Sequence, residues 1–141
     1  MSTTIASLPT APVPLRAGDT MTENQVGPLS RTDFVRYAGA GGDLNPIHHD
    51  DEFARAAGMP SVFGMGMLHA GILGTRLARW VGPNSIRTFT VRFSGQVWPG
   101  DVLTFAGHVD AVDGQLAELS MTVTRQTGDV AMSAKATALV A

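Results

Sequence analysis

Cysteine is absent from this chain of 141 residues. Its absence excludes disulfide bonds, thiolate metal sites and cysteine nucleophiles. Lysine is nearly absent too: Lys135 is the one lysine among ten basic residues, and the arginines are spread along the chain rather than clustered. With a formal net charge of −2, the composition gives no reason to expect nucleic acid as a partner.

Long apolar runs are also missing. No stretch approaches the roughly 20 residues that a membrane helix needs, and the first residues lack the basic and apolar segments of a secretory signal. We therefore expect a cytoplasmic protein with no membrane partner. The length fits one domain built around a single core.

The beginning of the sequence differs in composition from the rest. Residues 1–14 are small, polar and rich in proline, which predicts a disordered or extended tail. The folded domain is then predicted to span residues 15–141, starting with a short strand at about residues 20–26.

Helix signals follow this strand. Ser30 stands in an N-cap position with Asp33 three residues later, as in a capping box, and the helix should end near Ala38, where glycines begin. Pro46 disfavours a helical conformation at the residue before it, so the polar stretch around it is expected to form a shaped loop. A short helix is predicted at residues 51–57, with acidic residues in its first turn.

A longer helix is predicted at residues 66–80. A stripe of very small residues runs along it, formed by Ala70, Gly71, Gly74 and Ala78. Each interior glycine costs about 1 kcal/mol relative to alanine. We therefore expect another element to pack closely against this stripe.

From residue 85 onward the apolar residues recur with a period of two, which is typical of strands. Phe89, Val91 and Phe93 alternate with polar residues in the first of these strands. Turn sequences separate four consecutive strands, at Pro99-Gly100-Asp101, Asp113-Gly114 and Thr127-Gly128-Asp129.

Such a sheet must cover its apolar face, and the helix at residues 66–80 is the one long helix available. The sequence therefore predicts an α+β protein with a single hot-dog domain. In this fold a curved antiparallel sheet of about five strands wraps around one long central helix.

The loop between the first two predicted helices brings together a carboxylate and an imidazole, Asp43 and His48. Such a pair can share a water molecule: one group accepts a proton while the other orients the oxygen. Pro46 stiffens the loop, and the amide of Asn45 is a candidate for holding it in shape. We interpret Asp43 and His48 as the catalytic pair, with Asn45 and Pro46 as supporting residues.

Gly66 stands where the long helix should begin. A free backbone N–H at a helix N-terminus can donate to a carbonyl oxygen that is becoming an oxyanion, and glycine lets a substrate approach the backbone closely. Together with the pair, this donor suits addition of water across an alkene conjugated to a carbonyl, or the reverse reaction.

These residues belong to a motif that resembles a known family. The matching positions are Tyr37-Ala38, Gly42-Asp43-x-Asn45-Pro46-Ile47-His48-x-Asp50 and Ala54. The motif is similar to that of MaoC-like (R)-specific enoyl-CoA hydratases and, most of all, to actinobacterial (3R)-hydroxyacyl-ACP dehydratase subunits of the B type. The similarity extends through Gly66-Met67-Leu68, Trp80-Val81-Gly82 and Val91-Arg92-Phe93.

The resemblance implies that Asp43 and His48 are catalytic and that Gly66 supplies the oxyanion-hole N–H. It also implies a dimer with pantetheine near the subunit interface. Two positions depart from the family pattern: Met65 stands where the family usually has histidine, and His49 where it usually has a large apolar residue. Both put the choice of substrate in question rather than the class of reaction.

Other residues have further candidate roles. Tyr37, Met65 and Met67 are candidates for an acyl pocket. The run from His48 to Asp51 could suggest a metal site, but adjacent side chains point in different directions, so no metal is expected. His69 and His108 have no special sequence context and are expected to be structural.

The predicted function is therefore hydration of trans-2-enoyl thioesters or dehydration of (3R)-3-hydroxyacyl thioesters. No cofactor is expected, because the substrate arrives as a CoA or phosphopantetheine thioester, the latter on acyl carrier protein. Two alternatives stay open: a hot-dog acyl thioesterase, and a subunit that acts only with a second hot-dog chain. The partner is either a second copy, giving a homodimer, or another chain, giving a heterodimer.

Overall fold

The computed structural model describes residues 7–141. Its elements are β1 (Asn24–Val26), α1 (Arg31–Gly41), η1 (Pro46–His48), α2 (Asp51–Ala56), α3 (Gly66–Val81), η2 (Pro83–Ser85), β2 (Ile86–Phe93), β3 (Leu103–Asp113), β4 (Leu116–Arg125) and β5 (Val130–Leu139). In this part of the chain no helix is both long and apolar enough to cross a membrane.

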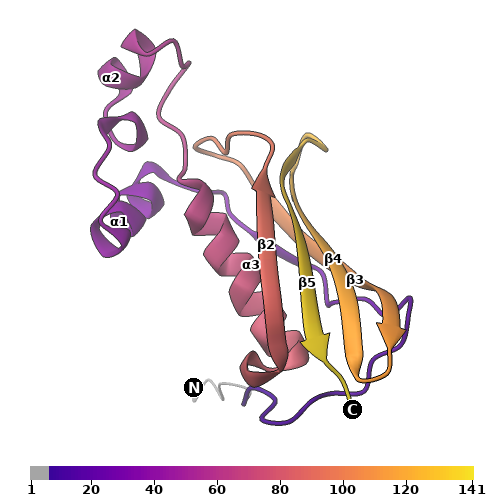
Figure 1. Cartoon of the computed structure of the whole chain (residues 1–141). Helices are drawn as coiled ribbons and strands as arrows, with labels where there is room; N and C mark the ends of the chain where they lie inside the picture. The colour runs from indigo at the N-terminus through magenta and orange to yellow at the C-terminus, as the bar shows by residue number, and fades with distance from the viewer. Residues whose placement is uncertain (1–6) are drawn as a thin grey trace, which may run out of the picture.

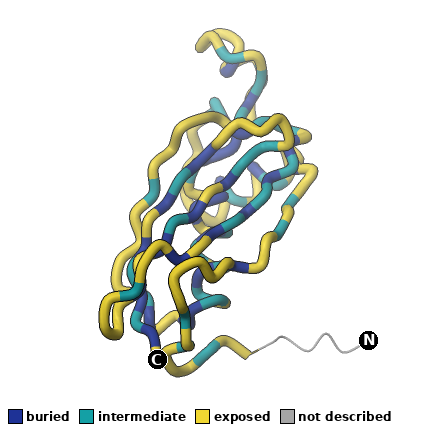
Figure 2. The backbone as a smooth tube through the Cα atoms, turned by 90° about the vertical axis from the view of Figure 1, so that its right-hand side faces the viewer, coloured by how far each residue is buried: buried dark blue, intermediate teal, exposed yellow. Residues whose placement is uncertain are grey.

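The five strands form one antiparallel sheet in the order β1-β3-β4-β5-β2. Helix α3 runs along one face of this sheet, and the strands curve past it (Figures 1 and 2). The α+β hot-dog fold predicted from the sequence is confirmed. The turn predictions are confirmed as well, since Gly100, Gly114 and Gly128 each connect two strands with a positive φ that favours glycine.

The face of α3 that packs into the core differs from the predicted one. Leu73 and Leu77 are completely buried, whereas Gly71 is exposed and has open space where a side chain would stand. Gly74 does allow a close approach, because a β-carbon there would meet the ring of Phe89 at 3.4 Å. The core contact is thus made by leucines, and only part of the small-residue stripe faces the sheet.

Strand β2 lies at one edge of the sheet, which changes the burial expected from its alternation. Phe89 and Phe93 point toward α3, as their contacts with Gly74 and Gly66 show, yet they remain 37% and 47% exposed. An edge strand has a neighbour on one side only, so its side chains are covered from fewer directions. This edge therefore presents apolar side chains beside unpaired backbone groups.

Two element boundaries differ from the predictions. The first strand covers only residues 24–26, and Thr20 forms an isolated bridge with His108. Helix α1 continues through Gly41 because its C-cap is Gly42, with φ of 74° in the left-handed region. The earlier glycines therefore lie inside the helix and do not end it.

The predicted tail lies only partly within the described residues. Residues 1–6 lie outside them. Val13 forms a bridge with Val140, and the Val13 carbonyl accepts from the N–H of Ala141. The division between tail and domain at residue 14 stays a prediction.

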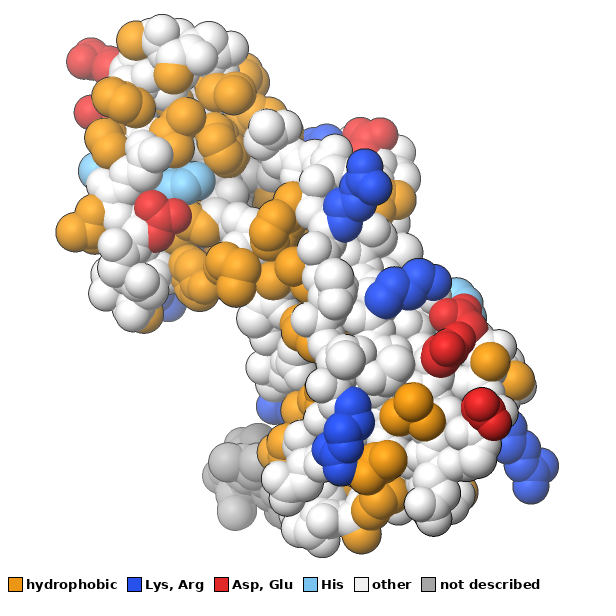
Figure 3. Space-filling model, in the orientation of Figure 1, with side chains coloured by type: hydrophobic (Ala, Val, Ile, Leu, Met, Phe, Trp, Pro, Cys, Tyr) orange, Lys and Arg blue, Asp and Glu red, His pale blue; other side chains and the backbone are white. Residues whose placement is uncertain are grey.

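The segment that contains α1, η1 and α2 stands off one end of the sheet, beyond the start of α3 (Figure 1). The predicted capping box begins it: Ser30 and Asp33 bond each other reciprocally. An ion pair of 3.1 Å between Arg31 and Asp51 joins α1 to α2. Hydrophobic side chains gather on the surface of this segment and on the narrow region that joins it to the sheet (Figure 3).

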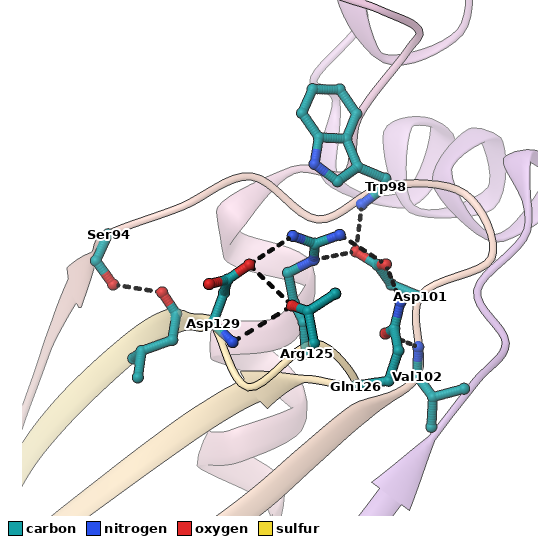
Figure 4. Close-up of polar contacts among 9 residues, drawn as sticks. Ser94, Trp98, Asp101, Val102, Arg125, Gln126 and Asp129 are labelled. Atoms are coloured by element: carbon teal, nitrogen blue, oxygen red, sulfur yellow. Dashed lines mark hydrogen bonds and ion pairs between the residues drawn. The ribbon is translucent and has the colours of Figure 1, made fainter.

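A buried ion pair fixes the loop between β2 and β3 (Figure 4). Asp101 accepts from Arg125 Nε at 2.7 Å and Nη2 at 3.1 Å, from Gln126 Nε2 at 2.8 Å and from the Trp98 N–H at 2.8 Å. Burial would raise the pKa of Asp101, but these hydrogen bonds outweigh it and hold the pKa below its ordinary value. The loop is thereby tied to the turn between β4 and β5.

We expect Asp101→Asn to lower the free energy of unfolding by about 3 kcal/mol, because it leaves Arg125 without its buried counter-charge. Asp129→Asn is the matched control, since Asp129 is an exposed partner of the same arginine and should contribute less than about 1 kcal/mol. Urea unfolding measures both. Equal losses of unfolding free energy in the two variants would show that burial of Asp101 does not increase the stability contributed by its ion pair with Arg125.

Candidate active site

His48 is the buried member of the predicted pair. Asn45 caps the short helix η1, its side-chain oxygen accepting from the N–H of Ile47 at 3.1 Å, and Pro46 opens the turn. The ring of His48 lies inside the protein, with Nδ1 2.7 Å from the carbonyl oxygen of Phe63. A carbonyl can only accept, so Nδ1 carries the proton. The other nitrogen, Nε2, therefore presents its lone pair in the neutral imidazole.

Asp43 faces that lone pair. Its Oδ2 lies 3.4 Å from His48 Nε2, and its Oδ1 accepts from the backbone N–H of Asn45 at 3.3 Å. About half of the Asp43 side chain is exposed, whereas His48 is enclosed. A carboxylate and an unprotonated Nε2 are both acceptors, so a water molecule with two O–H groups can donate to both at once. The structure brings the two residues together as the sequence predicted.

The partner of His48 is itself held in place. The N–H of Val62, the residue before Phe63, donates to Asp51 Oδ1 at 3.0 Å. This backbone hydrogen bond, followed by those from Arg31, holds the pKa of Asp51 below its ordinary value. The ring of Phe63 also packs edge-on against His48, with centroids 5.1 Å apart. The position of the imidazole thus depends on the contact between α2 and the chain that leads into α3.

The pair opens onto a cavity of about 490 Å³. Residues from the start of α3, from the chain before it and from the end of β2 line this space: Phe63, Gly64, Met65, Gly66, Met67, His69, Phe93, Ser94, Gly95 and Gln96. Asp43, His48 and Gly66 therefore share one cavity, together with Met65 and Met67.

Tyr37 lies elsewhere. It lines a neighbouring cavity of about 470 Å³, together with Leu68 and Ile72 on another face of α3. Three candidates for the acyl pocket were grouped by sequence, but the structure divides them between two spaces. Whether either space holds an acyl chain stays a prediction.

Gly66 is the first residue of α3, and no side chain caps this helix end. The first N–H groups of a helix have no acceptor within the helix, so the N–H of Gly66 is available to a ligand. Gly64 donates to the carbonyl of Val97 at 2.8 Å, which fixes this turn against the loop after β2. A β-carbon on residue 66 would lie 2.7 Å from Cε1 of Phe93. A side chain at this position would therefore displace the ring of Phe93.

The two departures from the family pattern have different surroundings. Met65 is buried and precedes Gly66 as the N-cap. His49 is exposed, and its ring points to the carbonyl of Leu44 rather than to the cavity. Among residues 7–141 no three side chains of the metal-binding types lie together. The expectation that the protein needs no metal stays a prediction.

Sequence patterns missed several cavity residues. Phe63 contributes a backbone carbonyl, which leaves no signal in residue type. Phe93 and residues 94–96 arrive from another part of the chain, so only the packing of β2 against α3 reveals them. His69, expected to be structural, lines the cavity, and neither of its ring nitrogens has a hydrogen-bond partner.

Comparison with known proteins shows the family. Residues 7–132 match the family model described as the MaoC-like domain. The chain belongs to the MaoC-like domain family. It is 28% identical over 99 residues to the 3-oxo-4,17-pregnadiene-20-carboxyl-CoA hydratase beta subunit of Mycobacterium tuberculosis, a match that covers 70% of this chain and 77% of that protein.

Larger proteins contain similar segments. The β subunit of fatty acid synthase from Saccharomyces cerevisiae is 29% identical over 123 residues, which cover 84% of this chain but only 6% of the synthase subunit. Among solved structures, the unliganded R-hydratase PhaJ1 from Pseudomonas aeruginosa superimposes with a TM-score of 0.79 at 24% identity, covering 92% of this chain and 86% of that one. This likeness supports the MaoC-like fold.

The burial of His69 predicts a pH dependence of folding. Burial lowers the pKa of His69 from 6.5 to about 4. The unfolded chain therefore binds a proton on this side chain between these pH values when the folded protein does not. The free energy of unfolding should fall by up to about 3 kcal/mol as the pH decreases from 6.5 to 4.

Urea unfolding of the wild type and of His69→Leu over this range tests the prediction. The variant cannot bind the proton, so its stability should fall less steeply. If the unfolding free energies of the two proteins changed with pH in parallel, the lowered pKa of His69 would be contradicted.

Proposed function

We propose that the protein catalyses the reversible addition of water to trans-2-enoyl thioesters, and the dehydration of (3R)-3-hydroxyacyl thioesters. The observation that carries this proposal is the common cavity of Asp43, His48 and the free N–H of Gly66. Membership of the MaoC-like family supports it, as does similarity to proteins whose names describe them as hydratases. The reaction needs no further cofactor, because CoA or a carrier protein brings the thioester.

Water is positioned by the pair. Its two O–H groups donate to Asp43 and to His48 Nε2, so its oxygen lone pairs face the cavity. The enoyl group lies with C3 next to this oxygen and with its carbonyl oxygen at the N–H of Gly66. The enoyl carbonyl draws electrons away from C3, which makes that carbon the site of attack.

Addition then proceeds in two proton movements. His48 Nε2 takes one proton of the water as the oxygen bonds to C3. The electron pair of the C2–C3 double bond moves into the C1–C2 bond, and the carbonyl pair moves onto its oxygen. The N–H of Gly66 stabilises this enolate. The imidazolium then returns its proton to C2 and the carbonyl reforms. Hydroxyl and hydrogen arrive from the same side, which gives syn addition.

We expect Asp43→Asn and His48→Gln each to lower kcat roughly 10²–10⁴-fold, the contribution typical of positioned acid–base groups. The assay follows loss of enoyl absorbance with trans-2-enoyl-CoA thioesters, from crotonyl-CoA to dodecenoyl-CoA. Glu118→Gln is the matched control, since Glu118 lies on β4 outside the cavity, and its activity should equal that of the wild type.

The same samples separate this reaction from thioester hydrolysis. Release of free thiol from the enoyl-CoA would identify a thioesterase, whereas hydration leaves the thioester intact. Wild-type activity in Asp43→Asn, or thiol release without loss of the double bond, would end the hydratase proposal.

We also propose that the protein works as a dimer. Strand β2 is an edge strand that exposes Phe89 and Phe93, and Phe93 also lines the cavity. Unpaired backbone groups beside apolar side chains favour pairing with another chain. The name of the mycobacterial relative describes it as a beta subunit, which indicates a protein with more than one chain. For this protein we propose two candidate partners, another copy of the chain or a related hot-dog chain.

Light scattering after size-exclusion chromatography measures this. We expect a mass of about twice the 14.8 kDa of one chain, either for the protein alone or after co-expression with a second hot-dog chain. A mass of 14.8 kDa under both conditions would contradict the dimer.

A further inference from the structure

His69 has surroundings that are unusual for a histidine. It lies on α3, is only 2% exposed, and neither ring nitrogen has a hydrogen-bond partner. Leaving a buried polar group unpaired costs roughly 1–3 kcal/mol, and leucine in its place would not carry that cost. The side chain nevertheless lines the cavity that contains Asp43 and His48. Such a side chain is a candidate to form a hydrogen bond with an atom of the bound substrate.

The position of His69 on α3 relates it directly to Gly66. Residues three apart lie on the same face of a helix, and helical side chains lean toward the N-terminus. The ring of His69 therefore lies over the first turn of α3. Contacts of Phe93 agree with this: its ring packs edge-on against His69, with centroids 5.9 Å apart, and it also covers the Cα of Gly66.

We propose that His69 is a second donor to the thioester carbonyl, its ring N–H acting on the same oxygen as the N–H of Gly66. This inference rests on the proposed function, because it assumes that the carbonyl binds at the first turn of α3. It assigns to the substrate the hydrogen bond that His69 lacks within the protein.

The protonation state of His69 suits this role. Burial lowers its pKa to about 4, so the ring is neutral at physiological pH and carries one N–H. A neutral imidazole donates without bringing a charge that would need a counter-ion in an enclosed space. Charge that develops on the carbonyl oxygen strengthens this hydrogen bond in the transition state more than in the ground state.

Phe93 packs against both residues. It is the last residue of β2, and almost half of its surface is exposed. Its ring can therefore turn outward without opening a hole in the core. An outward turn of this ring would widen the approach to His69 and Gly66.

Kinetics of three variants test the proposal, with the trans-2-enoyl-CoA of highest kcat/KM in the panel above as substrate. His69→Leu fills the space without a donor and should lower kcat roughly 10²–10³-fold while raising Tm. His69→Gln and His69→Asn place an amide N–H near the positions of Nε2 and Nδ1, and at least one should restore part of the lost rate. His108→Leu, which removes a histidine outside the cavity, is the control and should keep wild-type activity.

A vibrational measurement reports on the hydrogen bond itself. The same enoyl-CoA, isotopically labelled at its thioester carbonyl, is bound to Asp43→Asn, and the carbonyl stretch is recorded by difference infrared spectroscopy. We expect a shift to lower frequency relative to free substrate. Part of this shift should disappear in the double variant Asp43→Asn/His69→Leu. It should persist when residue 69 is instead the Gln or Asn that restores activity.

The outcomes separate this inference from the proposed function. A folded His69→Leu protein with activity within about twofold of wild type, or an unchanged carbonyl stretch in the double variant, would overturn the role of His69 alone. Loss of rate that neither amide restores would also overturn it. Wild-type activity in Asp43→Asn would instead overturn the hydratase assignment.

Discussion

The hydrogen bond from His48 Nδ1 to the carbonyl of Phe63 is the interaction on which the candidate site depends. It places the proton on the inner nitrogen and leaves a lone pair facing Asp43. The carbonyl is held because Asp51 binds the neighbouring N–H and because the chain then enters α3 at Gly66. The tautomer of His48 and the position of the Gly66 N–H are thus set by one continuous piece of backbone, residues 62–66.

Much of the fold follows from local chemistry. The capping box at Ser30 and the glycine turns between strands were predictable because each depends on residues close in sequence. The end of α1 was not, since Gly39 and Gly41 are compatible with a helix and only the left-handed backbone of Gly42 ends it. The exposure of Phe89 was also not predictable from the sequence, because an alternating pattern gives side-chain direction but not a strand's place in the sheet.

The residues of the candidate site also fall into those that the sequence predicted and those that it did not. Asp43, His48 and Gly66 lie within one stretch of sequence, and their spacing and resemblance to a family predicted that they act together. Phe93 and residues 94–96 come from the other side of the cavity, and residue type alone does not identify them. For His69 the informative property is the lack of a partner, which arises only when other elements have excluded water from its ring.

The ion pair beneath the loop after β2 affects how this scaffold can change. Asp101 and Arg125 hold the loop from its far end, while Ser94 and Gln96 border the cavity. Different side chains therefore anchor the loop and line the cavity. Exchanges at the rim can therefore change the shape of the cavity without disturbing the frame that holds the loop.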